Sequence, residues 1–224
     1  VDNPVLVQEM SFADLKTEKH LAINPMGTSP AFEDTDLGIT MWESGAILDY
    51  LLERYDTENQ FHPATTSDPE QIKVRAKYLQ LKQYIIATVY PFIASMYIHS
   101  LKKEKDEEYM AAAKKKCHTV LGPVMSTWLG DNQYFLGDEI SVLDFLAAKP
   151  LTNVEALGLL SGFPKLEALF ERVSSRPTYK EAYEGISYAE YDPDNRSMIV
   201  LVPQGFARKK KKRFSWRRSL ERAK

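Results

Sequence analysis

A proline stands inside a stretch that otherwise has the composition of a β-strand. The stretch GTSPAFED begins at Gly27, and a second strand-like run follows at residues 39–42. Proline cannot donate to a β-ladder, so it belongs on a sheet edge or in a turn. An X-Pro bond also becomes cis at small cost, and a cis bond is usually retained for a purpose. A cis Ser29-Pro30 bond would turn the main-chain N–H and C=O of Ser29 outward, free to pair with an extended peptide.

A helix start follows the second strand-like run. From Ser44 to Tyr55, apolar residues recur at helical spacing. The start of a helix presents unpaired N–H groups and a positive dipole to a carboxylate, and Glu43 beside it can receive an amine. The pattern suits a small peptide that carries both charges at one end. An edge proline next to an ordinary helix cap explains the same residues without any ligand, so both interpretations stay open.

The rest of the chain divides into a short α/β part and a helical part. We expect a strand at residues 5–10, a helix at 16–23, and strands at 31–33 and 39–42. A linker is expected at residues 57–68, followed by a helix from residue 69 through 97 with a kink near Pro91. Further helices are expected at 109–129 and 164–174, and a short last helix in SRPTYKEAY. Ser141 and Asp144 have the spacing of a capping box.

Composition excludes several classes of protein. No run of about 18 apolar residues exists, so we expect no membrane span, and no basic-plus-apolar leader marks a secretory signal. The single cysteine, Cys117, fits a reducing compartment. It lies on an apolar helical stripe, which predicts a buried packing role. The four histidines are scattered without metal-ligand spacing, so no metal is expected.

The net charge of −2 hides a strong asymmetry. Residues 208–224 hold ten Lys/Arg and one Glu, or +9, which leaves 19 basic and 30 acidic residues, or −11, for the remainder. Dense basic charge with Phe214 and Trp216 interleaved is attracted to anionic lipid, at roughly 1 kcal/mol per basic residue near the surface. Nuclear import, loose nucleic-acid binding and no specific role are alternatives. Neither end of the chain carries a lipidation motif.

Several ordered motifs resemble one family. The run NPMGTSPAFEDTD…WESGAILDYL resembles the glutathione-binding region of the cytosolic glutathione transferases, whose motif is NP-x-G-x-V-P-x-L-x-D followed by ES-x-A-I. KTEKHLAINPMGTSPAFED is most similar to the plant-type phi class. YFLGDEISVLDF resembles the signature of the family's helical domain, and SSRPTYKEAY its usual end. The resemblance runs from about Val5 to Tyr183.

The resemblance implies an α/β thioredoxin-like N-terminal domain, here incomplete, and an all-α C-terminal helical bundle domain, usually in a homodimer. The expected boundaries are 1–56 for the partial thioredoxin-like domain, 57–68 for the linker, 69–185 for the helical domain and 186–224 for an extension with the basic tail. Glutathione is the implied co-substrate, and a small hydrophobic electrophile is the implied second substrate. Cytoplasmic localisation is expected, with peripheral binding to anionic membranes through the tail as an addition.

The resemblance also implies roles for particular residues. Ser29, ahead of cis-Pro30, would pair with the cysteinyl backbone of glutathione. Glu43 and Ser44 would hold its γ-glutamyl end. Lys16 would meet the glycyl carboxylate, and Thr28 stands where a polar Gln is common. Two residues depart from the family pattern: Leu15 replaces the phi-class His, which weakens the glycyl subsite, and Ser29 replaces Val or Ile.

The family's thiol-activating Ser, Tyr or Cys has no counterpart in this sequence. It belongs to the first strand and helix, whereas Val1–Met10 corresponds to the second strand, which the first strand would otherwise neighbour. Ser11, the nearest hydroxyl, lies on the wrong side of the strand, so the catalytic residue is unknown. The chain is therefore expected to be a fragment of a complete enzyme, or else a catalytically silent scaffold.

An electrophile pocket would lie between the two domains, where ligand clefts commonly form. Tyr90, Phe92, Met96 and Tyr97 are candidates for its wall, although such residues are more often core.

In the tail, KKKKRFSWRRSL resembles the effector segment of the myristoylated alanine-rich C-kinase substrate proteins. That resemblance implies an anionic membrane or calmodulin as partner and phosphorylation at Ser215 and Ser219.

Together these observations predict a glutathione transferase that conjugates the glutathione thiolate to hydrophobic electrophiles or reduces organic peroxides. The alternative is a catalytically inactive scaffold of the same fold whose basic tail binds a membrane or calmodulin. A nucleic-acid-binding module rests only on the tail and gains nothing from the acidic body, so nucleic acid is not an expected partner.

Overall fold

The computed structural model describes residues 5–7, 10–11, 13–183, 187–192, 197–201 and 212–214. For the strands before residue 8 and after residue 186, and for Pro123 and Val124, it describes the backbone alone. The chain divides into two compact units. One comprises residues 1–57, 185–187 and 201–224, and we call it the N-terminal unit; the other, residues 58–184 and 188–200, is the helical unit.

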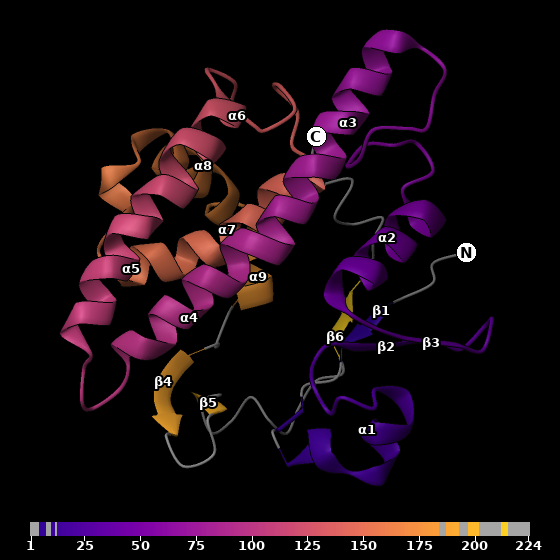
Figure 1. Cartoon of the computed structure of the whole chain (residues 1–224). Coiled ribbons are helices and arrows are strands. Elements are labelled where there is room, and N and C mark those ends of the chain that lie inside the picture. The colour runs from indigo at the N-terminus through magenta and orange to yellow at the C-terminus, as the bar shows by residue number, and fades with distance from the viewer. Residues whose placement is uncertain are drawn as a thin grey trace. The chain divides into compact units, whose positions relative to one another are not determined.

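The N-terminal unit combines short helices with an antiparallel hairpin (Figure 1). A 3₁₀ turn, η1 (Asp14–Lys16), leads into helix α1 (Glu18–Ile23). Strands β2 (Ala31–Asp34) and β3 (Ile39–Trp42) form the hairpin, and helix α2 (Ser44–Tyr55) follows. The predicted helix at 16–23 is therefore broken, because extended backbone at Thr17 separates η1 from α1. The Thr17 hydroxyl caps α1 by accepting from the His20 N–H.

Strand β1 (Val5–Val7) lies within the predicted strand at residues 5–10. Among the described residues it pairs with β6 (Lys212–Phe214) rather than with the hairpin. The pairing is antiparallel, with Leu6 opposite Arg213. Strand pairing is made by main-chain hydrogen bonds, which require no particular side-chain pattern. The basic sequence at residues 212–214 therefore did not indicate a strand.

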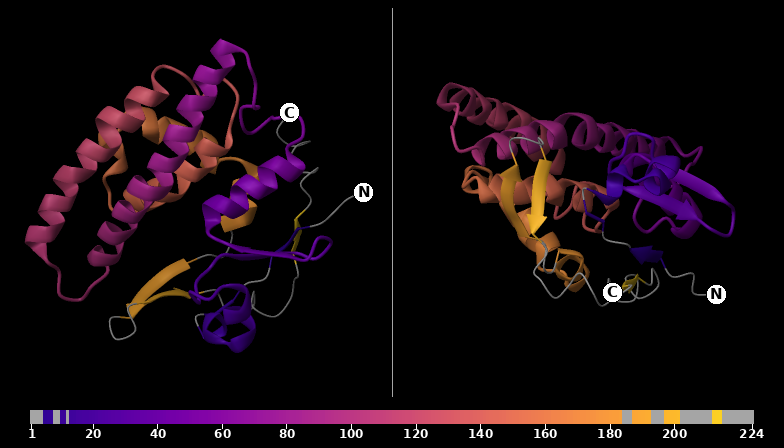
Figure 2. Two further views of the ribbon diagram at one scale, coloured as in Figure 1. Left: turned by 45° about the vertical axis from the view of Figure 1, so that its right-hand side comes forward. Right: turned by 90° about the horizontal axis from the view of Figure 1, so that it is seen from below.

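The helical unit contains α3 (Pro69–Tyr84), α4 (Tyr90–Ser100), α5 (Glu107–Thr119), α6 (Thr127–Leu129), α7 (Val142–Ala156), α8 (Pro164–Ser174) and α9 (Pro177–Tyr183). Helix α7 runs through its middle and packs against α3, α4 and α8 (Figure 1). Figure 2 shows α4 and α5 side by side, joined at one end. A 3₁₀ turn, η4 (Leu160–Gly162), precedes α8, and strands β4 (Ser187–Asp192) and β5 (Ser197–Leu201) pair with each other. No helix within the described ranges combines the length and apolarity that a membrane crossing needs.

Two long helices contain π-helical segments. The predicted kink near Pro91 is the segment η2 (Ile85–Val89) between α3 and α4, and a second segment, η3 (Val120–Ser126), joins α5 to α6. Proline removes one i→i−4 hydrogen bond and its ring crowds the preceding turn, so a widened turn at each proline is expected. The hydroxyl of Tyr84 donates to the carbonyl of Val120 at 3.0 Å and so links the two distorted regions.

Two helices of the helical unit begin at side-chain caps, and the predicted capping box of Ser141 and Asp144 is confirmed. Asp68 caps α3 by accepting from the Glu70 N–H at 3.0 Å, with Pro69 in the first turn. Ser141 and Asp144 form a capping box at the start of α7. The Asp144 carboxylate is fully buried and accepts from the Ser141 N–H at 2.7 Å, the Ser141 hydroxyl at 2.8 Å and the Phe135 N–H at 3.0 Å. Burial raises the pKa of Asp144, and these three donors oppose that rise.

We predict that Asp144→Ala destabilises the helical unit by roughly 2–5 kcal/mol, because it leaves two buried N–H groups without an acceptor. Urea unfolding followed by circular dichroism measures the change. Asp138→Ala is the matched control, since Asp138 is an exposed aspartate in the same loop. Equal unfolding midpoints for the two variants would contradict the role given to Asp144.

Candidate functional site

The register of the hairpin brings two distant parts of the sequence together. In β2 and β3, Ala31 lies opposite Trp42 and Asp34 opposite Ile39. Paired Cα atoms in an antiparallel ladder are about 4.5–5.5 Å apart. Ser29-Pro30, immediately before Ala31, and Glu43-Ser44, immediately after Trp42, therefore flank the open end of the hairpin. We call this end the candidate site.

The Ser29-Pro30 bond is cis, as the sequence predicted. Thr28, Ser29 and Pro30 are all exposed. In the part of the chain that the structure describes, neither the N–H nor the carbonyl of Ser29 has a hydrogen-bond partner. A main-chain donor and acceptor pair is thus available at the hairpin's open end.

Glu43 has an unusual backbone conformation on the other side of this end. Its φ of 74° and ψ of 111° lie outside the regions that a residue with a Cβ normally occupies. Such a conformation costs of order 1–3 kcal/mol and persists where the surrounding structure imposes it, often at functional sites. The Glu43 side chain is exposed and makes no cap hydrogen bond to α2. The sequence carried no signal of this conformation.

The start of α2 adds further donors. The Ile47 N–H bonds to the Glu43 carbonyl at 3.0 Å, which closes the first turn. The N–H groups of Ser44, Gly45 and Ala46 precede that bond and have no intrahelical acceptor. The first turn of α2 contains no acidic residue that would offset the helix dipole. An anionic group would be favoured here.

The far end of the hairpin is tied to the body of α2. Asp34 accepts at 2.6 Å from the Tyr50 hydroxyl and lies 3.2 Å from Nε of Arg54. Its other oxygen accepts from the N–H groups of Asp36 and Leu37 and so shapes the turn. The Tyr50 hydroxyl bond is the main reason that the pKa of Asp34 is lowered, so this carboxylate is charged at neutral pH. The hairpin is thereby held along α2.

Three side chains from the segment of η1 and α1 hold the loop that leads into Ser29. Lys16 ends η1, His20 lies in α1, and Asn24 caps the C-terminal end of α1. Lys16 Nζ donates to the Gly27 carbonyl at 3.0 Å, His20 Nε2 bonds to the Thr28 carbonyl at 2.9 Å, and Asn24 Nδ2 donates to the same carbonyl at 2.8 Å. We call these three residues the carbonyl clamp.

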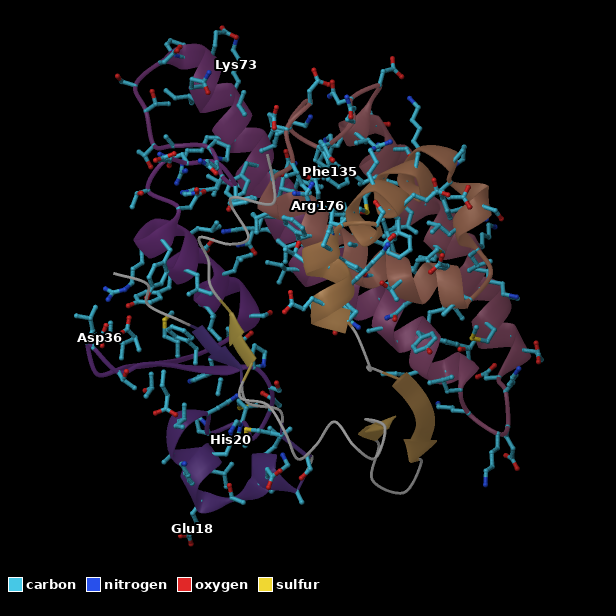
Figure 3. All side chains as sticks on the ribbon, turned by 180° about the vertical axis from the view of Figure 1, so that it is seen from behind. Glu18, His20, Asp36, Lys73, Phe135 and Arg176 are labelled. Atoms are coloured by element: carbon cyan, nitrogen blue, oxygen red, sulfur yellow. The ribbon has the colours of Figure 1, made fainter. Side chains whose placement is uncertain are left out.

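Figure 3 shows Glu18 at the outer side of α1, His20 on the side that faces the hairpin, and Asp36 at the hairpin tip. His20 and Asn24 are 3% and 1% exposed, so both are buried polar groups satisfied by the loop. The sequence interpretation did not include either residue in the site. Their four-residue spacing ahead of the proline was the available signal, although it says nothing of which carbonyl they reach.

Other residues named from the sequence lie elsewhere. Ser11 donates its hydroxyl to Asp14 at 2.7 Å in a local cap of η1. Met96 is fully buried in the helical unit, Tyr97 is half-buried and Tyr90 is 41% exposed. Their role in an electrophile pocket stays a prediction. Ser215 and Ser219 lie outside the described residues.

Cys117 is fully buried, as predicted, and its burial raises the pKa of the thiol to about 11. A thiol of that pKa is protonated at neutral pH and is a poor nucleophile. Across the described ranges, no three His, Cys, Asp or Glu side chains gather into a metal-binding group.

Comparisons with known proteins identify the domains to which the two parts of the chain are similar. Residues 5–53 match the pattern of the glutathione S-transferase N-terminal domain, and residues 70–177 match that of the C-terminal domain. A glutathione S-transferase of Pseudomonas fluorescens is 30% identical, with a TM-score of 0.58 over 73% of this chain and 78% of that one. The predicted fold class, a thioredoxin-like domain with an all-helical domain, is confirmed.

Two further proteins extend the comparison. Dichloromethane dehalogenase of Methylorubrum extorquens is 30% identical in an alignment 174 residues long, which covers 72% of this chain. The chain spans only 58% of that dehalogenase's length, less than two thirds. The glutathione transferase URE2P6 of Phanerochaete chrysosporium, solved with oxidized glutathione, has a TM-score of 0.68 at 20% identity, over 79% of this chain and 82% of that one. It supports the fold alone.

Gly27 provides a test of the loop that the carbonyl clamp holds. Its φ is +59°, and a Cβ at this position would lie 2.9 Å from Lys16 Nζ and 3.0 Å from the Leu15 carbonyl oxygen. Gly38 in the hairpin turn has a φ of +65°, but a Cβ there would meet nothing within 4 Å. A substitution at either glycine would strain the backbone, but only at Gly27 would the added Cβ also be crowded by neighbouring atoms.

We predict that Gly38→Ala lowers the free energy of unfolding by about 1–2 kcal/mol, from backbone strain alone. Gly27→Ala should lower it by about 2–4 kcal/mol, because crowding of the Leu15 carbonyl and loss of the Lys16 bond are added. Urea unfolding of both variants measures the difference. Equal losses would show that the loop relaxes away from the clamp.

Proposed function

Because the chain belongs to the glutathione S-transferase family, we propose that it binds glutathione at the open end of the β2–β3 hairpin. We further propose that its reaction is transfer of the glutathione thiolate to a hydrophobic electrophile, or reduction of an organic peroxide. The observation that carries the proposal is the exposed main chain of Ser29, which has no hydrogen-bond partner among the described residues, beside the N–H groups at the start of α2 that lack an intrahelical acceptor.

The proposed contacts follow from this arrangement. The N–H and carbonyl of Ser29, just before cis-Pro30, pair with the cysteinyl residue as one rung of a β-ladder. The γ-glutamyl carboxylate meets the N–H groups and hydroxyl at Ser44, and Glu43 receives its α-amine. Thr28 lines the same edge.

Lys16 is the proposed partner of the glycyl carboxylate. An ammonium has three N–H donors, and the bond to the Gly27 carbonyl uses one of them. Two donors therefore stay available for a carboxylate while Lys16 keeps its place in the carbonyl clamp.

The electrophile is proposed to be small and apolar. The similarity to a dichloromethane dehalogenase favours halogenated compounds among the candidates. Tyr90, Met96 and Tyr97 are the proposed pocket residues. A phi-like class, a homodimer and the cytoplasm stay predictions from the sequence resemblance.

The chemical step needs a thiolate. A free thiol with a pKa near 8.5 is mostly protonated at neutral pH, so an activating group must lower that value. No described residue is assigned this role, and Ser11 is engaged with Asp14. A glutathione-binding scaffold without turnover is therefore the second candidate.

Binding is tested first, with the whole chain applied to immobilised glutathione. We predict that the wild type is retained and that Glu43→Gln weakens affinity about tenfold, because a charge-assisted bond to the amine is lost. Ser44→Ala should weaken it about three- to tenfold. Glu53→Gln is the matched control, since Glu53 is exposed on the last turns of the same helix. Equal retention of all four proteins would refute the site.

Turnover then separates an enzyme from a scaffold. Conjugation of glutathione to an aromatic halide, and chloride release from dichloromethane, are measured for the wild type and for Glu43→Gln. An enzyme shows a rate above the uncatalysed reaction that falls in the variant at limiting glutathione. Retention on glutathione without any rate above background favours the scaffold.

For the tail we propose attraction to anionic membranes, carried by its charge of +9 over residues 208–224. Flotation with phosphatidylserine vesicles should recover the protein at low salt and lose it at high salt, because the attraction is screened. Glutamate at both Ser215 and Ser219 should reduce recovery. Recovery that is equal with neutral vesicles, or capture by calcium-loaded calmodulin instead, would argue against this role.

A further inference from the structure

The Thr28 carbonyl accepts two hydrogen bonds from buried side chains. His20 Nε2 lies 2.9 Å from it and Asn24 Nδ2 lies 2.8 Å from it. The two lone pairs of this oxygen are thus both used. Thr28 is exposed as a residue, but its carbonyl is held from the α1 side.

Peptide geometry passes this restraint to the next residue. The bond between Thr28 and Ser29 is trans, since the only cis bond in the described part of the chain is Ser29-Pro30. In a planar trans peptide the C=O of one residue and the N–H of the next point in opposite directions. Holding the Thr28 carbonyl toward α1 therefore aims the Ser29 N–H away from α1, into the candidate site.

We propose that His20 is a positioning residue for glutathione, which orients the Ser29 N–H by binding the opposite end of the same peptide group. This inference rests on the proposed glutathione site. The bond also polarises the peptide, because hydrogen bonds in a chain strengthen one another by about 10–30% each. His20 thus prepares the main-chain donor before glutathione arrives and lowers the ordering cost of binding.

His20 isolates this effect better than Asn24 does. Asn24 also donates to the Thr28 hydroxyl at 3.1 Å and accepts from the Met26 N–H at 3.0 Å, so its loss would disturb the whole turn. The side chain of His20 has one hydrogen bond among the described residues, to the Thr28 carbonyl. A substitution of His20 by a residue without a donor consequently removes one hydrogen bond to the Thr28 carbonyl and leaves in place the Asn24 bonds that shape the loop.

A packing role for His20 is the competing explanation, and two substitutions distinguish it. His20→Phe keeps an aromatic ring in the buried space and removes the donor. His20→Gln removes the ring and keeps an N–H donor at the reach of Nε2. If packing decides, the Phe variant resembles the wild type and the Gln variant is impaired. If the hydrogen bond decides, the order is reversed.

The test is isothermal titration calorimetry of reduced glutathione into the whole chain. We expect the dissociation constant to rise about three- to tenfold for His20→Phe and to stay within about twofold of the wild type for His20→Gln. Circular dichroism confirms that each variant is folded. Should the Phe variant not fold, His20→Asn replaces it, because its shorter amide stops about one bond short of the Thr28 carbonyl.

Each outcome decides between the two proposals. A wild type without affinity for glutathione overturns the proposed function and this inference with it. A wild type that binds, together with a Phe variant (or its Asn replacement) of equal affinity, overturns the inference and leaves the site intact. Equal weakening in the Phe and Gln variants also overturns it, because packing then accounts for the effect.

Discussion

The pairing of β2 with β3 is the constraint on which the candidate site depends. A ladder that sets Ala31 against Trp42 leaves Ser29-Pro30 and Glu43-Ser44 at the same end. A slip of one residue would turn each side chain to the other face and move these pairs apart. Asp34 opposes such a slip from the far end, because it binds both the hairpin turn and the Tyr50 hydroxyl.

Two devices prepare the site on either side of that ladder. On one side the carbonyl clamp directs the main chain around Ser29 through buried donors on α1. On the other side Glu43 is held in a costly backbone conformation at the junction of β3 and α2. The clamp stabilises one side, and the surrounding structure imposes the conformation of the other, so both sides adopt an arrangement that an isolated loop would not favour. Preorganisation of this kind would lower the entropy that the protein loses on binding the proposed tripeptide ligand.

Several helix starts were predictable from the sequence, because each depends on neighbouring residues. The cap at Asp68, the box at Ser141 and Asp144, and the start of α2 at Ser44 each depend on residues within four positions. The π-helical segments near Pro91 and Pro123 were only partly foreseeable, because a proline marks a kink but not its form. Pairing of β1 with β6 was not predictable, since it joins residues more than 200 positions apart through main-chain atoms.

By itself, the sequence determined the family resemblance, the starts of α2, α3 and α7 and the cis bond before Pro30, because each is written in short motifs. The tertiary structure alone decided that the His20 and Asn24 side chains meet one carbonyl, that Asp34 joins the hairpin to α2, and that Glu43 adopts a positive φ. The physical reason is that these contacts depend on how α1 and α2 pack around the hairpin. That packing is a property of the folded chain and not of any segment within it.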